Sequence, residues 1–215
     1  MTSKIAKVKR TATSVLLRLQ KQNPEPKCEL FFKTDYQLLV SVVLSAQSTD
    51  KMVNRCMEPL YRKNMTPETV IKMGIKGFES KIRSLGLAPT KAKNVFHLSR
   101  RVVEEFQGRV PDSREELESL PGVGRKTASV VLAEVFHHPT LAVDTHVFRV
   151  TRRLGLHNES TPMKAEGRLM EVVPSRFLPK AHHWFIQLGR YTCKAQKPLC
   201  HLCHVQDLCP SSLPL

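Results

Sequence analysis

The segment LPGVGRKTA at residues 120–128 predicts a tight turn between two helices. Gly122 and Gly124 leave the turn almost without side chains, since glycine reaches backbone angles that are closed to other residues. Apolar residues follow the turn at helical spacing, at positions 128, 131, 132 and 135. Before the turn, Ser113 and Glu116 fit the pattern of a capping box that opens a short helix. The segment therefore indicates a helix, a glycine hairpin and a second helix.

The hairpin has the composition of an anion-binding site. Its bare N–H groups and the N-terminus of the second helix together favour an anion such as a DNA phosphate. Lys126 lies in the first turn of that helix, beside the expected anion. On the hairpin alone, a lysine that holds phosphate is a better interpretation than a lysine that does chemistry.

The charge of the chain points to a polyanionic partner. Its 215 residues include 34 Lys and Arg against 19 Asp and Glu, a formal net charge of +15. Nucleic acid and an anionic membrane are the leading options, and a generally basic surface is the plain alternative. No apolar run reaches about 18 residues, and the N-terminus lacks the apolar region of a signal peptide. We therefore expect neither a membrane span nor secretion.

Helical periodicity runs through the chain and predicts an all-α protein. The run at 36–46 is apolar on nearly all sides; its length favours a buried helix over a buried strand. We expect Asp35, Asp50, Thr66 and Asp144 to cap the helices that follow them. The expected helices lie at 5–19, 36–46, 51–60, 67–73, 78–85, 92–106, 114–120, 125–135, 145–154, 162–173 and 180–191. No strand pair is expected.

Four of the six cysteines crowd into the last 23 residues, which indicates a metal site rather than disulfides. Cys193, Cys200, Cys203 and Cys209 have the spacing C-x6-C-x2-C-x5-C. Four thiolates from one compact loop suit a tetrahedral zinc or a cubane iron–sulfur cluster. The spacing alone leaves the identity of the metal open.

The motifs, taken in order and at these separations, resemble the endonuclease III family of DNA repair glycosylases. The hairpin is followed by AVDTH at 142–146 and by the cysteine tail. The resemblance runs from about residue 28 to 209, and it includes LSAQSTD at 44–50 and HHWFIQLGRYTC at 182–193. It implies a two-lobed helix-hairpin-helix fold that grips DNA between its lobes, and a 4Fe-4S cluster on the four cysteines.

The same resemblance implies two domains. Residues 28–138 would form a six-helix lobe that contains the helix-hairpin-helix at about 113–137. Residues 1–27 and 139–215 would form a second helical lobe, which carries the cluster loop at 193–209.

By resemblance, Lys126 is the nucleophile that attacks the sugar C1′, expels the damaged base and forms a Schiff base. An attacking amine must be neutral, and lowering an ordinary lysine pKa from about 10.4 to about 8 takes roughly 3 kcal/mol. A helix N-terminus supplies only ~0.3–1 kcal/mol. Arg125 and desolvation would have to supply the rest.

Two acidic residues are also candidates for the catalytic site. Asp144 fits an ordinary helix N-cap. By resemblance it acts with Lys126, and there it stabilises positive charge on the sugar or moves protons, because an ion pair would raise the pKa of the amine. Glu118 matches an acidic family position that helps order the cleft, and it could equally be a solvated helix residue.

The remaining candidates contact DNA. A base that undergoes chemistry must leave the stack, and by resemblance Gln47 and Leu87 fill the gap. Without the resemblance, they read as a turn glutamine and a hydrophobic contact after a helix. The hairpin residues Gly122, Gly124 and Arg125 hold the strand, and Lys194 and Lys197 in the cluster loop contact the DNA backbone.

The sequence thus predicts a bifunctional DNA N-glycosylase and β-elimination lyase that removes oxidised pyrimidines from damaged double-stranded DNA. We expect a monomer in the bacterial cytoplasm, associated with the nucleoid. A monofunctional adenine-type glycosylase is one alternative, but it normally lacks a lysine at position 126. A non-catalytic DNA-binding module held by a metal is another. A ribonucleoprotein or membrane-surface role rests on charge alone.

Overall fold

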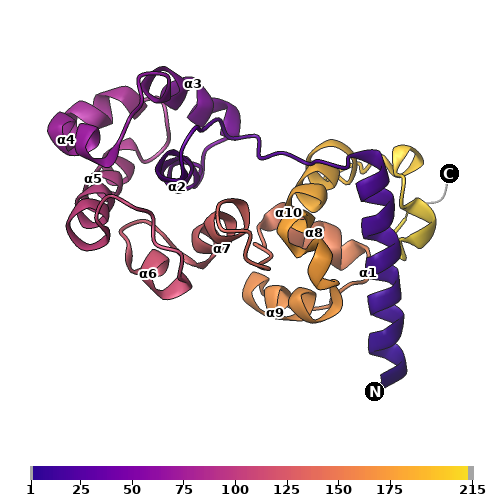
Figure 1. Cartoon of the computed structure of the whole chain (residues 1–215). Coiled ribbons are helices and arrows are strands. Elements are labelled where there is room, and N and C mark those ends of the chain that lie inside the picture. The colour runs from indigo at the N-terminus through magenta and orange to yellow at the C-terminus, as the bar shows by residue number, and fades with distance from the viewer. Residues whose placement is uncertain (1, 213–215) are drawn as a thin grey trace. The chain divides into compact units, whose positions relative to one another are not determined.

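The computed structural model describes residues 2–212, with side chains from residue 4 onward. Every regular element in this range is helical, so the all-α prediction is confirmed (Figure 1). The chain divides into two compact units. One is Cys28–Phe136, and the other combines Met1–Lys27 with His137–Leu215. Among the helices of the described residues, none is long and apolar enough to cross a membrane.

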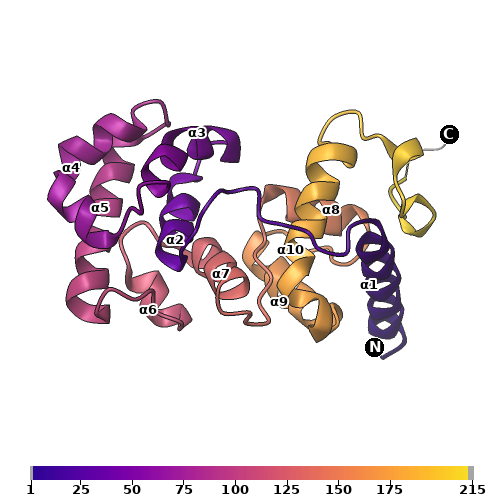
Figure 2. The same cartoon turned by 45° about the horizontal axis from the view of Figure 1, so that its top comes forward.

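The unit Cys28–Phe136 is built around a buried helix. Its helices are α2 (Asp35–Leu44), α3 (Asp50–Tyr61), α4 (Pro67–Ile82), α5 (Ala88–Phe106), α6 (Arg114–Ser119) and α7 (Arg125–Glu134). α2 contacts α3, α5 and α7, while α4 and α5 lie side by side (Figures 1 and 2). The apolar run of the sequence is therefore a buried helix, as predicted.

Gln37 and Ser41, two polar residues buried within α2, find partners inside the core. Every residue from Tyr36 to Leu44 is buried. Gln37 Nε2 donates to the Met65 carbonyl at 3.2 Å, and Ser41 Oγ bonds with the Tyr61 hydroxyl at 2.8 Å. These bonds remove the cost of burying a polar group among apolar neighbours.

The predicted caps at Asp35 and Asp50 are wrong by one residue. Thr34 caps α2, where its Oγ accepts from the Gln37 N–H, and Thr49 caps α3 in the same way. Each aspartate is instead the first helical residue, where a carboxylate is favoured by the positive end of the helix. Thr66 caps α4 as predicted, with a capping box.

Helix α4 is interrupted where the sequence predicts a stop. Gly74 has φ +69° and ψ 170°, a backbone conformation that breaks the helix in two. The residue lies between the two short helices expected at 67–73 and 78–85. Its glycine permits the positive φ without the clash that a Cβ would bring.

The other unit is built from both ends of the chain. It contains α1 (Thr2–Gln22), α8 (Thr145–Arg153), α9 (Pro162–Val172) and α10 (Leu178–Gln187), with short turns at η1 (Ser175–Phe177), η2 (Leu188–Thr192), η3 (Cys200–Leu202) and η4 (Gln206–Leu208). The apolar stripe of α1 is buried at Ala12, Val15 and Leu16. Arg18 of α1 forms a double hydrogen bond with Asp207, so the C-terminal loop lies beside α1 (Figure 2).

Candidate active site and cysteine loop

The hairpin between α6 and α7 uses its two glycines differently. Gly122 has φ +81°, and a Cβ there would lie 3.0 Å from the Asn94 side chain and 3.2 Å from Val43 Cγ1. This position therefore requires glycine for both its backbone and its packing. Gly124 has φ −103°, and a Cβ at this position would meet only open space, so the fold itself does not require glycine there.

Gly124 leaves the N-terminus of α7 open. It is the N-cap residue of α7, and no side chain caps the helix. The first N–H groups of a helix attract anions, and a glycine beside them lets a ligand approach closely. Arg125 and Lys126 are the first two residues of α7, and both are exposed. The hairpin therefore presents an open helix N-terminus beside two exposed basic residues, and anion binding there stays a prediction.

Helix α6 is joined to α7 through Arg114. Its Nη1 lies 3.0 Å from Ser129 Oγ, 3.5 Å from the Arg125 carbonyl and 3.4 Å from Glu118 Oε1. Glu118 is exposed on α6 and lies one helical turn after Arg114. In the unit that holds it, Glu118 thus contributes to the brace between α6 and α7.

The turns that carry Gln47 and Leu87 lie next to each other. A Cβ on Gly86 would lie 3.6 Å from the Gln47 carbonyl. Gln47 has φ +54° and Leu87 has φ +60°, and both residues are exposed. Left-handed backbone at residues other than glycine is uncommon and costs about 1–3 kcal/mol each. The structure therefore brings together two strained, exposed side chains that are 40 positions apart in the sequence.

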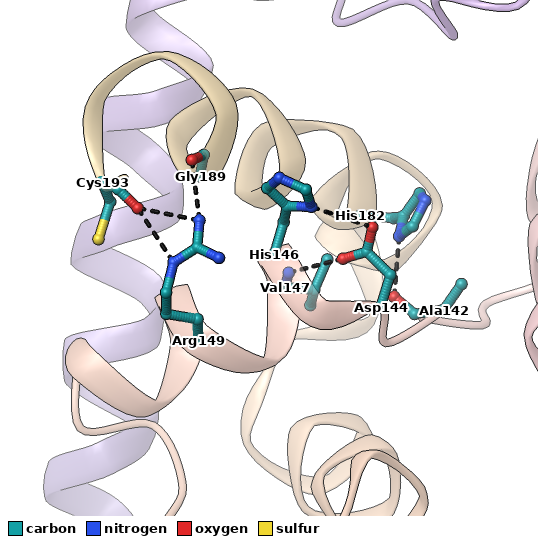
Figure 3. A network of polar contacts seen from close by, with 8 residues as sticks. All are labelled: Ala142, Asp144, His146, Val147, Arg149, His182, Gly189 and Cys193. Carbon is teal, nitrogen blue, oxygen red and sulfur yellow. Dashed lines mark hydrogen bonds and ion pairs between the residues drawn. The ribbon is translucent and has the colours of Figure 1, made fainter. Parts of the chain in front are cut away.

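Asp144 caps α8, as predicted, and is largely buried. Its Oδ1 accepts from the Val147 N–H at 2.7 Å, and its Oδ2 lies 3.6 Å from His146 Nδ1 (Figure 3). The extended segment before it is held by His182 of α10, whose Nδ1 lies 2.8 Å from the Ala142 carbonyl. A carbonyl only accepts, so Nδ1 carries the proton of that ring. The carboxylate of Asp144 is therefore held by the N–H of Val147, and the backbone just before it is held by His182.

The sequence does not single out this bracing of Asp144. From the sequence, His182 is interpreted as a packing or capping residue, and His146 has no assigned role. The signal available is the pair of adjacent histidines in the HHW segment at 182–184. Nothing in the sequence indicates that one of them reaches Ala142, which lies 40 residues away.

Helix α8 also holds the start of the cysteine loop. Arg149 donates to the carbonyls of Gly189 and Cys193 at 2.9–3.2 Å (Figure 3). Arg153, one turn later, donates to the carbonyls of Lys194 and Ala195 at 2.7 and 3.0 Å. These charge-assisted bonds fix the backbone of the loop. The loop side chains Lys194 and Lys197 remain exposed.

The four cysteines of the tail line one cavity in the structure. Cys193, Cys200, Cys203 and Cys209 all belong to its wall, together with Arg153. Burial raises the pKa of the Cys203 and Cys209 thiols. Across the described residues, no three Cys, His, Asp or Glu side chains are arranged to hold a metal ion as they stand. The four thiols therefore share one cavity and supply soft sulfur donors, while a metal on them stays a prediction.

Lys126 and Asp144 belong to different units, and so do the hairpin and the cysteine loop. In the unit Cys28–Phe136, the hairpin packs against α2 and α5, and the Gln47 turn lies next to the Leu87 turn. Within the other unit, the structure groups Asp144 with the helix that holds Cys193.

Comparison with known proteins assigns the class. Residues 40–175 match the family model described as HhH-GPD superfamily base excision DNA repair protein. Endonuclease III of Haemophilus influenzae is 47% identical over 91% of this chain and 92% of the relative. Endonuclease III of Escherichia coli K12 is 45% identical over the same shares of the two chains.

Solved structures agree with this result. A trapped endonuclease III–DNA covalent intermediate matches with a TM-score of 0.88 and 41% identity, covering 94% of this chain and 96% of that one. A thermostable thymine-DNA glycosylase matches with a TM-score of 0.83 at 24% identity, which supports the fold alone.

The helical fold and the hairpin thus define a helix-hairpin-helix protein of base excision DNA repair. Within that class, the chain belongs to the endonuclease III family. It is accordingly an enzyme, a DNA N-glycosylase and AP lyase of base excision repair.

Proposed function

We propose that Lys126 is the nucleophile with which this chain removes oxidised pyrimidines from damaged double-stranded DNA. The observation that carries the proposal is the position of Lys126, exposed in the first turn of a helix whose N-terminus is open. A phosphate bound at that terminus would hold a DNA strand beside the amine. The trapped covalent complex formed by a 41% identical relative supports a covalent step.

The reaction proceeds through a covalent intermediate on Lys126. Its neutral Nζ bonds to the sugar C1′ while the bond from C1′ to the base breaks and the base takes up a proton. Opening of the sugar ring and loss of the amine proton leave a Schiff base between Nζ and C1′. Removal of a C2′ proton then expels the 3′ phosphate and cuts the strand. Water hydrolyses the Schiff base and regenerates the lysine.

Asp144 stabilises the positive charge that develops on the sugar, or it moves protons during base loss and elimination. Its cap to Val147 leaves the carboxylate rigid, which is what electrostatic stabilisation requires. Glu118 supports the site indirectly, through its contact with Arg114 in the brace between α6 and α7.

The hairpin, two inserting residues and the cysteine loop bind the DNA. Backbone N–H groups at Gly122 and Gly124, with Arg125, hold a phosphate. The amide of Gln47 replaces the partner of the orphaned base, and Leu87 wedges between base steps. Lys194 and Lys197 contact the backbone without sequence preference. The enzyme acts as a monomer on bacterial chromosomal DNA, which locates it at the nucleoid in the cytoplasm.

The four cysteines would hold a 4Fe-4S cluster, through Cys193, Cys200, Cys203 and Cys209. Their common cavity and their soft sulfur donors support this choice of cofactor. The cluster, when bound, supplies four covalent links that fix the loop. The reacting sugar is handled by Lys126 and Asp144, and the lysines of the loop bind DNA.

Borohydride trapping tests the proposal. A duplex that carries an oxidised pyrimidine is incubated with the protein and borohydride, which reduces a Schiff base to a stable bond. We expect a covalent adduct from the natural chain and from the control Lys93→Gln, an exposed lysine of α5. We expect none from Lys126→Gln. An adduct from Lys126→Gln would exclude Lys126 as the nucleophile, and binding without cleavage by the natural chain would favour a non-catalytic module.

A further inference from the structure

A buried lysine lies beneath the turns that carry Gln47 and Leu87. Lys91 is in the first turns of α5 and is only 4% exposed. Lysine is almost never buried this deeply without a partner. Its Nζ donates to Ser48 Oγ at 2.8 Å. Desolvation lowers the pKa of Lys91 below its ordinary value.

The bond from Lys91 joins the two turns. Ser48 follows Gln47 directly, while the backbone N–H of Lys91 donates to the Leu87 carbonyl at 2.9 Å. One residue is therefore attached to the Leu87 turn by its backbone and to the Gln47 turn by its side chain. The close approach of Gly86 to the Gln47 carbonyl completes the contact.

The strained backbone of both turns explains why a hydrogen bond between them is needed. Gln47 and Leu87 each hold a left-handed backbone conformation that neither residue type favours. Such conformations persist only where the surrounding structure over-determines them. Loss of the bond to Ser48 would let the Gln47 turn relax, while α5 itself would keep its helical bonds.

A purely structural role is a poor explanation for this residue. An apolar side chain of similar length would fill the same space without the cost of burying an amine. The neighbours of Lys91 on α5, Ala92 and Val95, are fully buried and supply the packing. The amine therefore contributes a directed hydrogen bond to Ser48 rather than packing volume.

We propose that Lys91 is a positioning residue for base extrusion, which fixes the Gln47 and Leu87 turns together before DNA arrives. The proposal rests on the insertion roles of Gln47 and Leu87 given above. Lys91 reaches the DNA only through these two residues. It acts on the extrusion step and leaves the chemistry of Lys126 unchanged.

The test uses a probe that reports insertion without chemistry. A duplex carries a tetrahydrofuran abasic analogue, which has no reactive C1′, opposite 2-aminopurine, whose fluorescence rises when it is unstacked. The variants are Lys91→Met, which removes the amine and keeps an unbranched side chain only one atom shorter, and Ser48→Ala, which removes the acceptor. Lys93→Met is the matched control, since Lys93 is exposed on the same helix. All are compared at saturating protein.

We expect Lys91→Met and Ser48→Ala to keep less than about a third of the fluorescence rise, because the inserted arrangement is no longer preformed. Lys93→Met keeps the full rise. Single-turnover excision of an oxidised pyrimidine falls about tenfold in the first two variants. Strand cleavage at a ready-made abasic site changes less than about twofold, since no base has to be extruded. The double variant resembles either single variant, because both remove the same bond.

Two results would overturn the proposal. One is a full fluorescence rise with Lys91→Met. The other is an equal loss of excision and of abasic-site cleavage together with a lower melting temperature, which is the signature of a general folding role. The variant Lys126→Gln separates this question from that of the nucleophile. It should give the full rise without trapping, so a failure of Lys126 as nucleophile leaves the fluorescence result intact.

Discussion

At the scale of single residues, the two hairpin glycines separate folding from binding. Gly122 is required by its positive φ and by the side chains of Asn94 and Val43, which a Cβ at this position would crowd. Gly124 adopts a backbone conformation open to any residue, with empty space beside it. A glycine that the fold does not require, at an open helix N-terminus, indicates a close approach by a ligand.

The pair Gly122→Ala and Gly124→Ala tests this distinction. We expect Gly122→Ala to lower the free energy of unfolding by about 1–3 kcal/mol, from backbone strain and overpacking. Gly124→Ala should leave the melting temperature nearly unchanged but weaken binding to a duplex with an abasic analogue, because a methyl group would obstruct the phosphate. Thermal denaturation and fluorescence anisotropy measure the two effects. Equal loss of stability in both variants would contradict the assignment.

A substitution at Asp144 separates its capping role from its chemical role. Asparagine caps helices as well as aspartate does, so Asp144→Asn should keep the bond to Val147 and the melting temperature. Losing the charge should slow single-turnover excision by roughly 10²–10⁴-fold while DNA binding is largely kept. A stable variant with unchanged excision would reduce Asp144 to an ordinary cap.

At the scale of elements, the sequence predicts helices well and their contacts poorly. The run at 36–46, the interruption at Gly74 and the cap at Asp144 follow from local physics, and the structure has all three. The caps at Thr34 and Thr49 escape prediction because Thr-Asp pairs offer two candidates, and only the backbone geometry selects between them. Local rules of this kind place the helices but miss some of their ends by three or four residues, as for α5, which begins at Ala88 rather than at 92.

Contacts between distant segments cannot be read from the sequence. Lys91 precedes the helix that the sequence predicts at 92–106, and a lysine gives no apolar signal of burial, yet the structure buries it at the start of α5. The bonds from Lys91 to Ser48 and from His182 to Ala142 join residues about 40 positions apart. Such pairs depend on how helices pack, and one chain carries no pattern that marks them.

The cysteine loop supports a prediction of its own. Purified natural protein should contain about four irons per chain and absorb visible light, as expected for a cubane cluster on four thiolates. Cys200→Ser should lose iron and absorbance, and it should bind DNA more weakly because the loop with Lys194 is no longer fixed. Cys56→Ser, which alters a thiol outside the loop, is the control. A colourless protein that contains zinc would contradict the cluster.

At the scale of the whole molecule, the chain divides its candidate chemistry between two units. Lys126 and the inserting residues belong to Cys28–Phe136, while Asp144 and the cysteines belong to the unit that joins the two ends of the chain. The net charge of +15 suits a polyanion, and phosphate contacts give affinity without sequence preference. Selectivity must then come from extrusion and chemistry at the damaged base.

The central claim is that Lys126 bonds to the sugar, and mass analysis of the trapped complex tests it most directly. The borohydride-reduced adduct is digested with a protease and a nuclease, and the modified peptide is sequenced by mass spectrometry. We expect a reduced sugar fragment attached to Lys126 and to no other lysine. An adduct on a different residue, or on the N-terminal amine, would contradict the account.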